Sequence, residues 1–295
     1  MASYILSCCS TVDLSEEHLK ERDIHYIPFH FRLDGKDYPD NFGASLSYKD
    51  FYQAMREHLP AATSQVNMSE YLNYFEGFLK EGLDILHVCF SSGLSGTYNS
   101  CMNAARIARE RYPERTIIII DSLAASSGYG LLMNTLADLR DTGMSIESLS
   151  AWAEENKLRV HHLFFSTDLS YYVQGGRISR AGAIFGGLLN ICPFLNMNHE
   201  GRLIPRERPR GKQMAMKRML AKMEELADNG TLYDGPVYIC HSDCIDDANQ
   251  VADMVKERFQ SVKEPVRIYY VGTTIGVHTG PGTVALFFFG KKREN

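Results

Sequence analysis

Apolar and polar positions alternate along this chain in blocks that predict strands followed by helices. Residues 3–8 and 83–90 have the apolar patterns of buried strands, and the almost wholly β-branched run at 116–121 has the clearest one. Helical patterns follow these strands, including one at 97–111. Strands that alternate with helices predict a mainly parallel sheet with helices on its faces.

Shorter signals refine this pattern in the first half of the chain. The dipeptide Asp34-Gly35 lies between two alternating runs and predicts a β-hairpin turn. Ser47 is followed three residues later by Asp50, which resembles a capping box and predicts the start of a helix. Ser69 is predicted to cap the helix after that.

A second group of elements begins near residue 160. Its predicted strands lie at 162–166, 237–240, 266–271 and 283–289, and its predicted helices at 211–227 and 246–259. Two further strands are predicted on either side of a turn at 199–201, and the HTGPG sequence at 278–282 is predicted to be a tight loop. The fold class is therefore α/β, with two α/β lobes at 1–160 and 161–295 and a cleft between them.

Composition narrows the classes of function. A net charge of -5 argues against general nucleic-acid binding, which requires a basic surface. No apolar run reaches the roughly 20 residues of an integral membrane span, and the N-terminus lacks the layout of a signal peptide. The seven cysteines follow no disulfide framework, so we expect reduced thiols and a cytoplasmic protein.

The stretch SSGLSGTYNS at 91–100 directly follows a predicted buried strand. Ligands of parallel α/β sheets bind beyond the carboxyl ends of the strands, where this stretch lies. Its small residues, its hydroxyls and the start of the next helix suit one anion, such as a carboxylate or a phosphate. We expect Thr97 only to cap that helix, whereas Ser95, set between two glycines, is expected to face a ligand.

The common catalytic and metal-binding motifs do not fit the sequence. Around Ser95 the nucleophile-elbow pattern G-x-S-x-G fails, because Thr97 stands where the second glycine is required. A phosphate-binding P-loop is absent, and the sequence SGYGLLM lacks the third glycine of a dinucleotide site. The sequence CHSDC at 240–244 lacks the second ligand pair of a zinc site, so no metal is expected.

Six motifs in order nevertheless resemble those of one family. They are ATSQVN, SSGLSGTYNS, DSLAASSGYG, VQGGRIS, LLNICPFLNMNHEGRLIPRERPRGK and HTGPG, and they span nearly the whole chain. Together they resemble the DegV family, whose members bind fatty acids. One position departs from the family pattern, because Cys8 stands where an aspartate is usual, and any role of that aspartate is not carried over.

The resemblance implies a fold with a ligand tunnel between two lobes and a carboxylate held by hydroxyl groups. Carried over to this sequence, Thr63 and Ser95 are the expected carboxylate donors, and Ser64 and Gly96 of the same motifs are expected to bind the ligand with them. Arg177 and His278 are expected to lie close to them as further candidates for binding the ligand. The alternatives are that His278 is a core histidine and that Arg177 orients backbone carbonyls between the lobes.

An acyl tail of 16 to 18 carbons, such as palmitate or stearate, also needs an apolar tunnel, which the resemblance implies. The sequence AGAIFGGLLNICPFLN supplies apolar candidates for its walls, although ordinary core packing explains most of them. These candidates are Ile184, Phe185, Leu188, Leu189 and Ile191. No cofactor is expected beyond the fatty acid itself.

Some members of the family present their fatty acid to a separate fatty acid kinase, which forms an acyl phosphate for phospholipid synthesis. A basic cluster on this acidic chain suits that partner or the added phosphate, or is only a solvated loop. Its members are Arg202, Arg206, Arg208, Arg210 and Lys212. The resemblance thus implies a carrier without catalysis of its own, and the alternative is a hydrolase or phosphoryl-transfer enzyme that uses Ser95.

Overall fold

The computed structural model describes residues 4–179 and 190–294. Its first sheet is parallel and four-stranded, in the order β2-β1-β6-β7. These strands are β1 (Tyr4–Cys9), β2 (His25–Ile27), β6 (Asp84–Cys89) and β7 (Ile117–Asp121). The parallel sheet predicted for the first half is therefore confirmed, and its strands are buried as the β-branched runs require.

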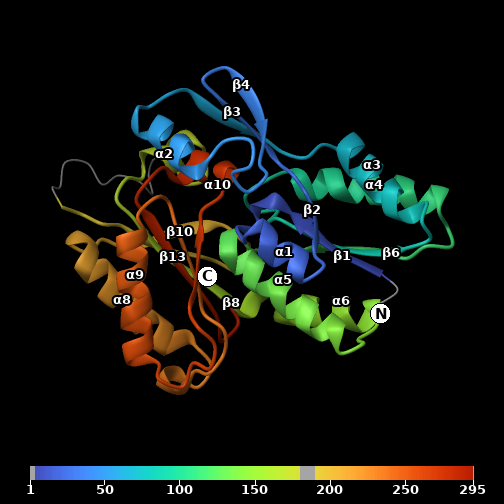
Figure 1. Ribbon diagram of the computed structural model, residues 1–295. Helices are drawn as coiled ribbons and strands as arrows, with labels where there is room; N and C mark the ends of the chain where they lie inside the picture. Colours follow the sequence, from blue (N-terminus) through green and yellow to red (C-terminus); the bar gives the residue numbers. More distant parts are fainter. Residues whose placement is uncertain (1–3, 180–189, 295) are drawn as a thin grey trace.

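Helices cover both faces of the parallel sheet (Figure 1). On one side lie α3 (Met68–Leu79) and α4 (Thr97–Arg111), and on the other lie α5 (Ser126–Asp141) and α6 (Ile146–Asn156). The short α1 (Glu16–Glu21) begins at Ser15, whose side chain accepts a hydrogen bond from the N–H of His18. The predicted cap of α3 is wrong, because Asn67 rather than Ser69 forms a capping box with Glu70.

The second sheet has six strands in the order β10-β9-β8-β13-β11-β12. They are β8 (Val160–Ser166), β9 (Phe194–Met197), β10 (Leu203–Glu207), β11 (Tyr238–His241), β12 (Arg267–Tyr270) and β13 (Thr283–Phe289). Only β11 and β12 pair in parallel, so the expectation of a mainly parallel sheet is wrong for this half. The reason is that β9 and β10 form a hairpin, and β13 returns between β8 and β11 in the opposite direction.

The helix α5 lies between the two large sheets. It packs against α6 and also against β8, β11 and β13. The buried residues of α5 lie on all sides of the helix. Two of them, Gly128 and Gly130, allow close contact with neighbouring elements. On the far side of the second sheet lie α8 (Gly211–Leu226) and α9 (Ile245–Arg258), close to the helices predicted there.

A third, antiparallel sheet forms from β3 (His30–Leu33), β4 (Lys36–Pro39) and β5 (Ala61–Ser64), in the order β4-β3-β5. The predicted hairpin turn is confirmed, because Asp34 and Gly35 both have positive φ angles, 48° and 76°. The helix α2 (Tyr48–Arg56) begins at Ser47 as predicted, since the Ser47 hydroxyl accepts a hydrogen bond from the N–H of Asp50.

A helix near the end of the chain, α10 (Thr273–Thr279), packs on this third sheet and on α2. The tight loop predicted at 278–282 is therefore partly wrong, because His278 lies in the last turn of a helix that ends at Thr279, and the turn begins at Gly280, whose φ is 63°. The β-branched start of α10 has no side-chain cap, which is why the local pattern did not predict a helix.

The remaining short elements are α7 (Ser170–Gln174) and the 3-10 turns η1 (Ser10–Val12), η2 (Lys157–Arg159) and η3 (Gly230–Leu232). One large hydrophobic core includes side chains from both halves, such as Leu6, Leu136, Phe164 and Ala285. The division into lobes at 1–160 and 161–295 stays a prediction.

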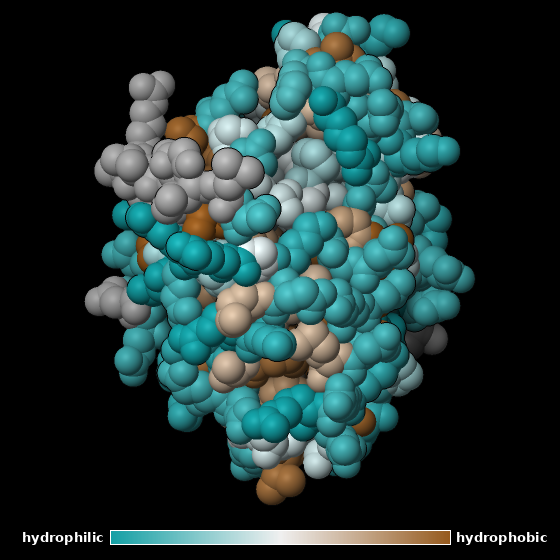
Figure 2. Space-filling view, turned by 90° about the vertical axis from the view of Figure 1, so that its left-hand side faces the viewer, coloured by the Kyte–Doolittle hydropathy of each residue, from teal (hydrophilic) through white to brown (hydrophobic). Residues whose placement is uncertain are grey.

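The surface is mainly hydrophilic on the face shown in Figure 2, with apolar residues in small separate areas. Isolated apolar residues of this kind are normal on a protein surface. Within residues 4–179 and 190–294, no helix combines the length and the apolar character that crossing a membrane requires.

Candidate functional site

The residues 91–96 between β6 and α4 form a serine-rich loop. A cavity of about 470 Å³ lies where this serine-rich loop, β5 and α10 meet the second sheet. Ligand pockets of proteins have volumes of about 300–1,000 Å³, so the cavity suits a small molecule. Its apolar lining includes Met197 and Ala285, and most of it is aromatic or branched, namely Phe29, Phe90, Leu94, Phe164, Leu203, Val271, Ile275 and Phe287.

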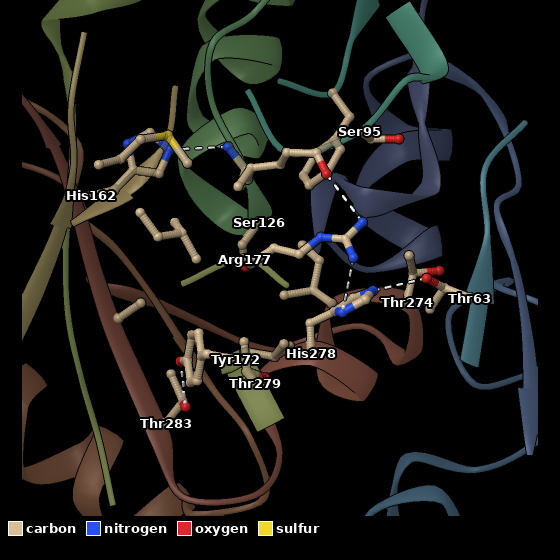
Figure 3. Close-up of a pocket in the computed structure, with 18 of the residues that line it drawn as sticks. Thr63, Ser95, Ser126, His162, Tyr172, Arg177, Thr274, His278, Thr279 and Thr283 are labelled. Atoms are coloured by element: carbon tan, nitrogen blue, oxygen red, sulfur yellow. Dashed lines mark hydrogen bonds between the residues drawn. The ribbon is translucent and has the colours of Figure 1, made fainter. Parts of the chain in front are cut away.

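Polar groups gather at one end of the cavity (Figure 3). Thr63 from β5, Ser95 from the serine-rich loop and His278 from α10 lie there with Arg177. The Thr63 Oγ1 atom lies 2.8 Å from His278 Nε2, and His278 Nδ1 lies 3.5 Å from a guanidinium nitrogen of Arg177. The structure therefore brings together four residues that the sequence predicted for the site.

These contacts determine the tautomer of His278. Arginine can only donate hydrogen bonds, so His278 Nδ1, which faces Arg177, is the acceptor. His278 Nε2 then carries the proton and donates a hydrogen bond to Thr63 Oγ1. The hydroxyl proton of Thr63 is consequently free to bond a ligand.

The imidazole of His278 is neutral at physiological pH. Desolvation lowers its pKa to about 4, and the positive charge of Arg177 acts in the same direction. Burial also lowers the pKa of Arg177, although its guanidinium stays charged. The polar end thus holds one cation and several neutral donors.

Arg177 also makes the contacts expected of its alternative role, in which it orients backbone carbonyls. Its guanidinium donates to the backbone carbonyls of Gly175 and Leu94, the latter at 3.1 Å. Because Leu94 belongs to the serine-rich loop, Arg177 joins this loop to the segment that follows α7. The same side chain lines the cavity, so positioning of the loop and contact with a ligand are compatible.

Ser95 lines the cavity, and its hydroxyl oxygen accepts a hydrogen bond from the N–H of Thr97 at 3.2 Å. Its hydroxyl proton is not used in that bond. The expectation that Thr97 caps α4 is wrong, because its buried hydroxyl lies 2.8 Å from the Tyr71 hydroxyl instead. Gly96 is the N-cap residue and lies close to Gln65, so an added Cβ would come within 2.7 Å of the Gln65 side-chain oxygen.

The serine-rich loop rests on the turn between β9 and β10. Ser91 donates a hydrogen bond to the carbonyl of Gly201 at 2.8 Å. A Cβ at Gly93 would lie 2.4 Å from the carbonyl oxygen of Glu200, so only glycine allows this approach. The sequence carries no local signal of this contact, because the two segments are more than 100 residues apart.

Further polar residues that the sequence did not indicate also line the cavity. They are Gln65, Ser126, His162, Tyr172, Thr274, Thr279 and Thr283. Several of these are already bonded within the protein, since Tyr172 and Thr283 share a hydrogen bond of 2.9 Å and His162 accepts one from the N–H of Ala125. Ser64 also lines the cavity, although it is exposed.

A second cavity of about 350 Å³ adjoins the polar end. Thr63, Arg177 and His278 line both cavities and therefore stand between them. His58 and Tyr171 are among the residues on the far side, with the Tyr171 hydroxyl bonded to the carbonyl of Met55. A group bound at the polar end is consequently approachable from this second side.

Two further groups of predicted residues are the apolar walls of the tail tunnel and the basic cluster. Ile184, Phe185, Leu188 and Leu189 lie outside the described residues, and Ile191 is not among the residues that line the cavity. In the basic cluster, Arg206, Arg208 and Arg210 are exposed and outside the cavity. They occupy alternate positions along and just after β10, and Arg206 donates to the side-chain oxygen of Asn196 at 2.8 Å.

Cys8, which replaces an aspartate in the motif pattern, is fully buried in β1 and does not line the cavity. Burial raises the pKa of its thiol well above the ordinary value. Among the described residues, one group of potential metal ligands converges, namely His87, Cys89 and Cys101, and none of the three lines the cavity.

Comparison with known proteins gives consistent matches over the whole chain. The sequence model of the DegV family, described as a family of uncharacterised proteins, matches residues 9–291. A DegV domain-containing protein of Clostridium perfringens is 37% identical over 294 residues, with full coverage of both chains. One from Lactococcus lactis is 32% identical, with 96% of each chain covered.

Solved structures agree with these matches. A structure from Thermus thermophilus, described as showing fatty acid binding of a DegV family protein, has a TM-score of 0.86 and 26% identity over 98% of this chain and 99% of that one. A DegV lipid-binding protein of Thermotoga maritima has a TM-score of 0.85 and 25% identity, with both chains fully covered.

Proposed function

The chain belongs to the DegV family, and from this and its cavity we infer that it binds a long-chain fatty acid without covalent chemistry. The observation that carries this proposal is the division of the cavity into one polar end and a largely apolar remainder. A fatty acid has the same division, with a carboxylate at one end of an alkyl chain. The Thermus thermophilus relative is described as binding fatty acid, which supports the same ligand class here.

The carboxylate is placed at the polar end, where Thr63 and Ser95 each keep a hydroxyl proton to donate. Arg177 and the start of α4 add positive electrostatic potential beside these donors. Hydrogen bonds to a charged group contribute about 1.5–3 kcal/mol each. His278 supports Thr63 by occupying its acceptor lone pair, so that the threonine proton points elsewhere.

The tail is placed among the aromatic and branched side chains of the cavity. Along β13, the alternate residues Thr283, Ala285 and Phe287 all face it. Burial of each methylene contributes about 0.8 kcal/mol, so a chain of palmitate or stearate length supplies ample binding free energy after the cost of association.

The contacts of Ser95 favour a carrier over an enzyme that uses this serine as a nucleophile. A nucleophilic serine requires a general base within hydrogen-bonding reach. His278 is a candidate base at the same end of the cavity, yet its Nε2 donates to Thr63 and its Nδ1 faces Arg177. The Ser95 hydroxyl instead accepts from the N–H of Thr97.

A fatty acid kinase is the partner that we propose for the carrier. The second cavity supports this role, because it reaches the residues around the carboxylate from outside the tail cavity. The exposed arginines at 206, 208 and 210 suit an acidic surface of the partner. All seven cysteines are free thiols, which supports the predicted cytoplasmic location of such a reaction.

Native mass spectrometry of the purified chain tests the proposed ligand. We expect an added mass of one long-chain fatty acid, which organic extraction removes and added palmitate restores. A protein that purifies without lipid, and that neither palmitate nor stearate then binds, contradicts the proposal. A mass that stays after denaturation contradicts non-covalent binding.

A further inference from the structure

We propose that Cys9, His87, Cys89 and Cys101 form a zinc-binding site between the parallel sheet and the helices α3 and α4. The set has the composition of a three-cysteine, one-histidine zinc site. It lies outside the fatty-acid cavity, and the proposal is independent of the fatty acid.

The fold brings the four side chains to one face of the sheet. His87 and Cys89 are two residues apart on β6 and therefore point to the same face. Ser7 of β1 is in register with His87, so Cys9, two residues further along β1, faces the same way. Cys101 comes from α4, which lies with α3 over this face (Figure 1).

Three of the four ligand atoms have nearly the spacing that zinc requires, and the sulfur of Cys9 lies beside the histidine of this group. Those of His87, Cys89 and Cys101 all lie within 4.8 Å of one another, and Cys9 Sγ lies 3.8 Å from His87 Nε2. Bonds of about 2.0–2.3 Å in tetrahedral geometry separate the ligands by roughly 3.5–3.8 Å. Zinc binding thus requires inward shifts of the ligands, including a shift of Cys9 towards the group of three.

The histidine is oriented as a metal ligand. His87 Nδ1 lies 2.7 Å from the Ser7 hydroxyl, which occupies that side of the ring. Its Nε2 faces Cys9 Sγ at a distance too long for a strong hydrogen bond. In zinc sites the ligating histidine typically donates its other N–H to a neighbouring group, the role that Ser7 has here.

Donors also surround the sulfur of Cys9. The Tyr71 hydroxyl lies 3.2 Å from this sulfur. Thr97, 2.8 Å from the Tyr71 hydroxyl, is placed to donate to Tyr71 in turn. Such donors stabilise the negative charge of a metal-bound thiolate.

The proton balance of binding is simple. Each of the three thiols loses its proton to solvent, and three S–Zn bonds and one N–Zn bond form, with His87 neutral throughout. The site then has a net charge of about -1, which the donors around Cys9 offset in part. A disulfide within the cluster would leave His87 and one sulfur without a role, whereas one metal ion uses all four groups.

Metal analysis of the full chain tests the site. The protein is purified under reducing conditions without chelators, and its zinc content is measured by mass spectrometry. The zinc is then exchanged for Co²⁺, whose absorption reports tetrahedral geometry and the number of thiolates. We expect one metal ion per chain with the charge-transfer absorption of three thiolates.

Variants locate the site. The variant Cys101→Ser is expected to lose about a third of the charge-transfer absorption and to bind Co²⁺ at least tenfold more weakly. Cys192→Ser removes a buried thiol just before β9 and is the matched control, with unchanged absorption expected. Equal effects of the two substitutions would overturn the proposal.

X-ray absorption at the zinc edge of the unmodified protein provides a test that needs no variant to fold. Three sulfur ligands at about 2.3 Å and one nitrogen ligand support the site. A shell of oxygen and nitrogen alone, or reduced protein that binds neither Zn²⁺ nor Co²⁺, overturns it and leaves a buried cluster of thiols. Stoichiometric binding of copper with exclusion of zinc also overturns the assignment.

Discussion

Thr63 Oγ1 lies 2.8 Å from His278 Nε2, although 215 residues separate them in the sequence. This contact joins β5 to α10 and leaves the hydroxyl proton of Thr63 free at the polar end of the cavity. The proposed carboxylate site depends on it, because a threonine whose proton were used within the protein would present only an acceptor to an anion.

Removal of the Thr63 hydroxyl is expected to weaken fatty acid binding. The substitution Thr63→Val keeps the β-branched shape, and the lost hydrogen bond to a charged group costs about 1.5–3 kcal/mol, or roughly tenfold to hundredfold in affinity. Displacement of a fluorescent fatty acid measures this effect. Thr63→Ser retains the hydroxyl and is expected to bind nearly as well as the parent, and equal losses in both variants would contradict the assigned hydrogen bond.

Ser95→Ala is expected to weaken binding by a similar factor, since it removes the second hydroxyl donor. Ser92→Ala is the matched control, because Ser92 is exposed in the same loop and does not line the cavity. Retained affinity in Ser92→Ala together with a loss in Ser95→Ala supports the site. If affinity is the same in both variants, Ser95 only supports the start of α4.

The pH dependence of His278 follows from its lowered pKa. The native pKa of about 4 lies below the unfolded value near 6.5, so the native state binds fewer protons between these values. The contribution of His278 to stability is therefore complete above about pH 6.5 and is lost as the pH falls towards 4. Nuclear magnetic resonance of the ligand-free protein should show a neutral ring protonated on Nε2 at pH 6, and a midpoint near 6.5 would contradict this.

Narrowing the cavity is expected to select against long fatty acids. Ala285→Leu adds three carbons to a side chain that lines the cavity from β13. Each methylene that no longer fits loses about 0.8 kcal/mol of burial, so stearate should lose more affinity than laurate. Binding constants for a series of chain lengths test this. A uniform loss across the series would place the tail elsewhere.

Loss of the basic cluster is expected to affect the partner and not the fatty acid. A triple variant with alanine at Arg206, Arg208 and Arg210 should keep its fatty acid affinity, because these residues lie outside the cavity. Acyl phosphate formation with the cognate kinase should slow, with a salt dependence that differs from that of the parent.

A charge-matched control removes three exposed basic residues from the first half of the chain, namely Lys20, Lys80 and Arg106. This control should retain the parent rate of acyl phosphate formation. A triple arginine variant that folds but loses the fatty acid would assign the cluster to the ligand site. Equal rates in both triple variants would leave the arginines as a solvated loop.

Several features could be predicted from the sequence because neighbouring residues determine them. The β-branched run at 117–120 and the helix at 97–111 follow from local pattern, and the hairpin at Asp34-Gly35 follows from the residues that a positive φ favours. The position of Ser95 beyond the end of β6 also follows from strand order alone. Resemblance of the motifs to the DegV family pointed to a fatty acid ligand.

Contacts between distant segments depend on the tertiary structure. The direction of β13 between β8 and β11 is decided by sheet pairing, which has no local signal, and α10 is stabilised by packing on β3, β5 and α2 rather than by its own propensity. The pairing of Thr63 with His278 and the convergence of Cys9 with His87 arise only when those elements pack. Local sequence sets the conformation of each segment, whereas the burial of apolar surface selects which segments meet.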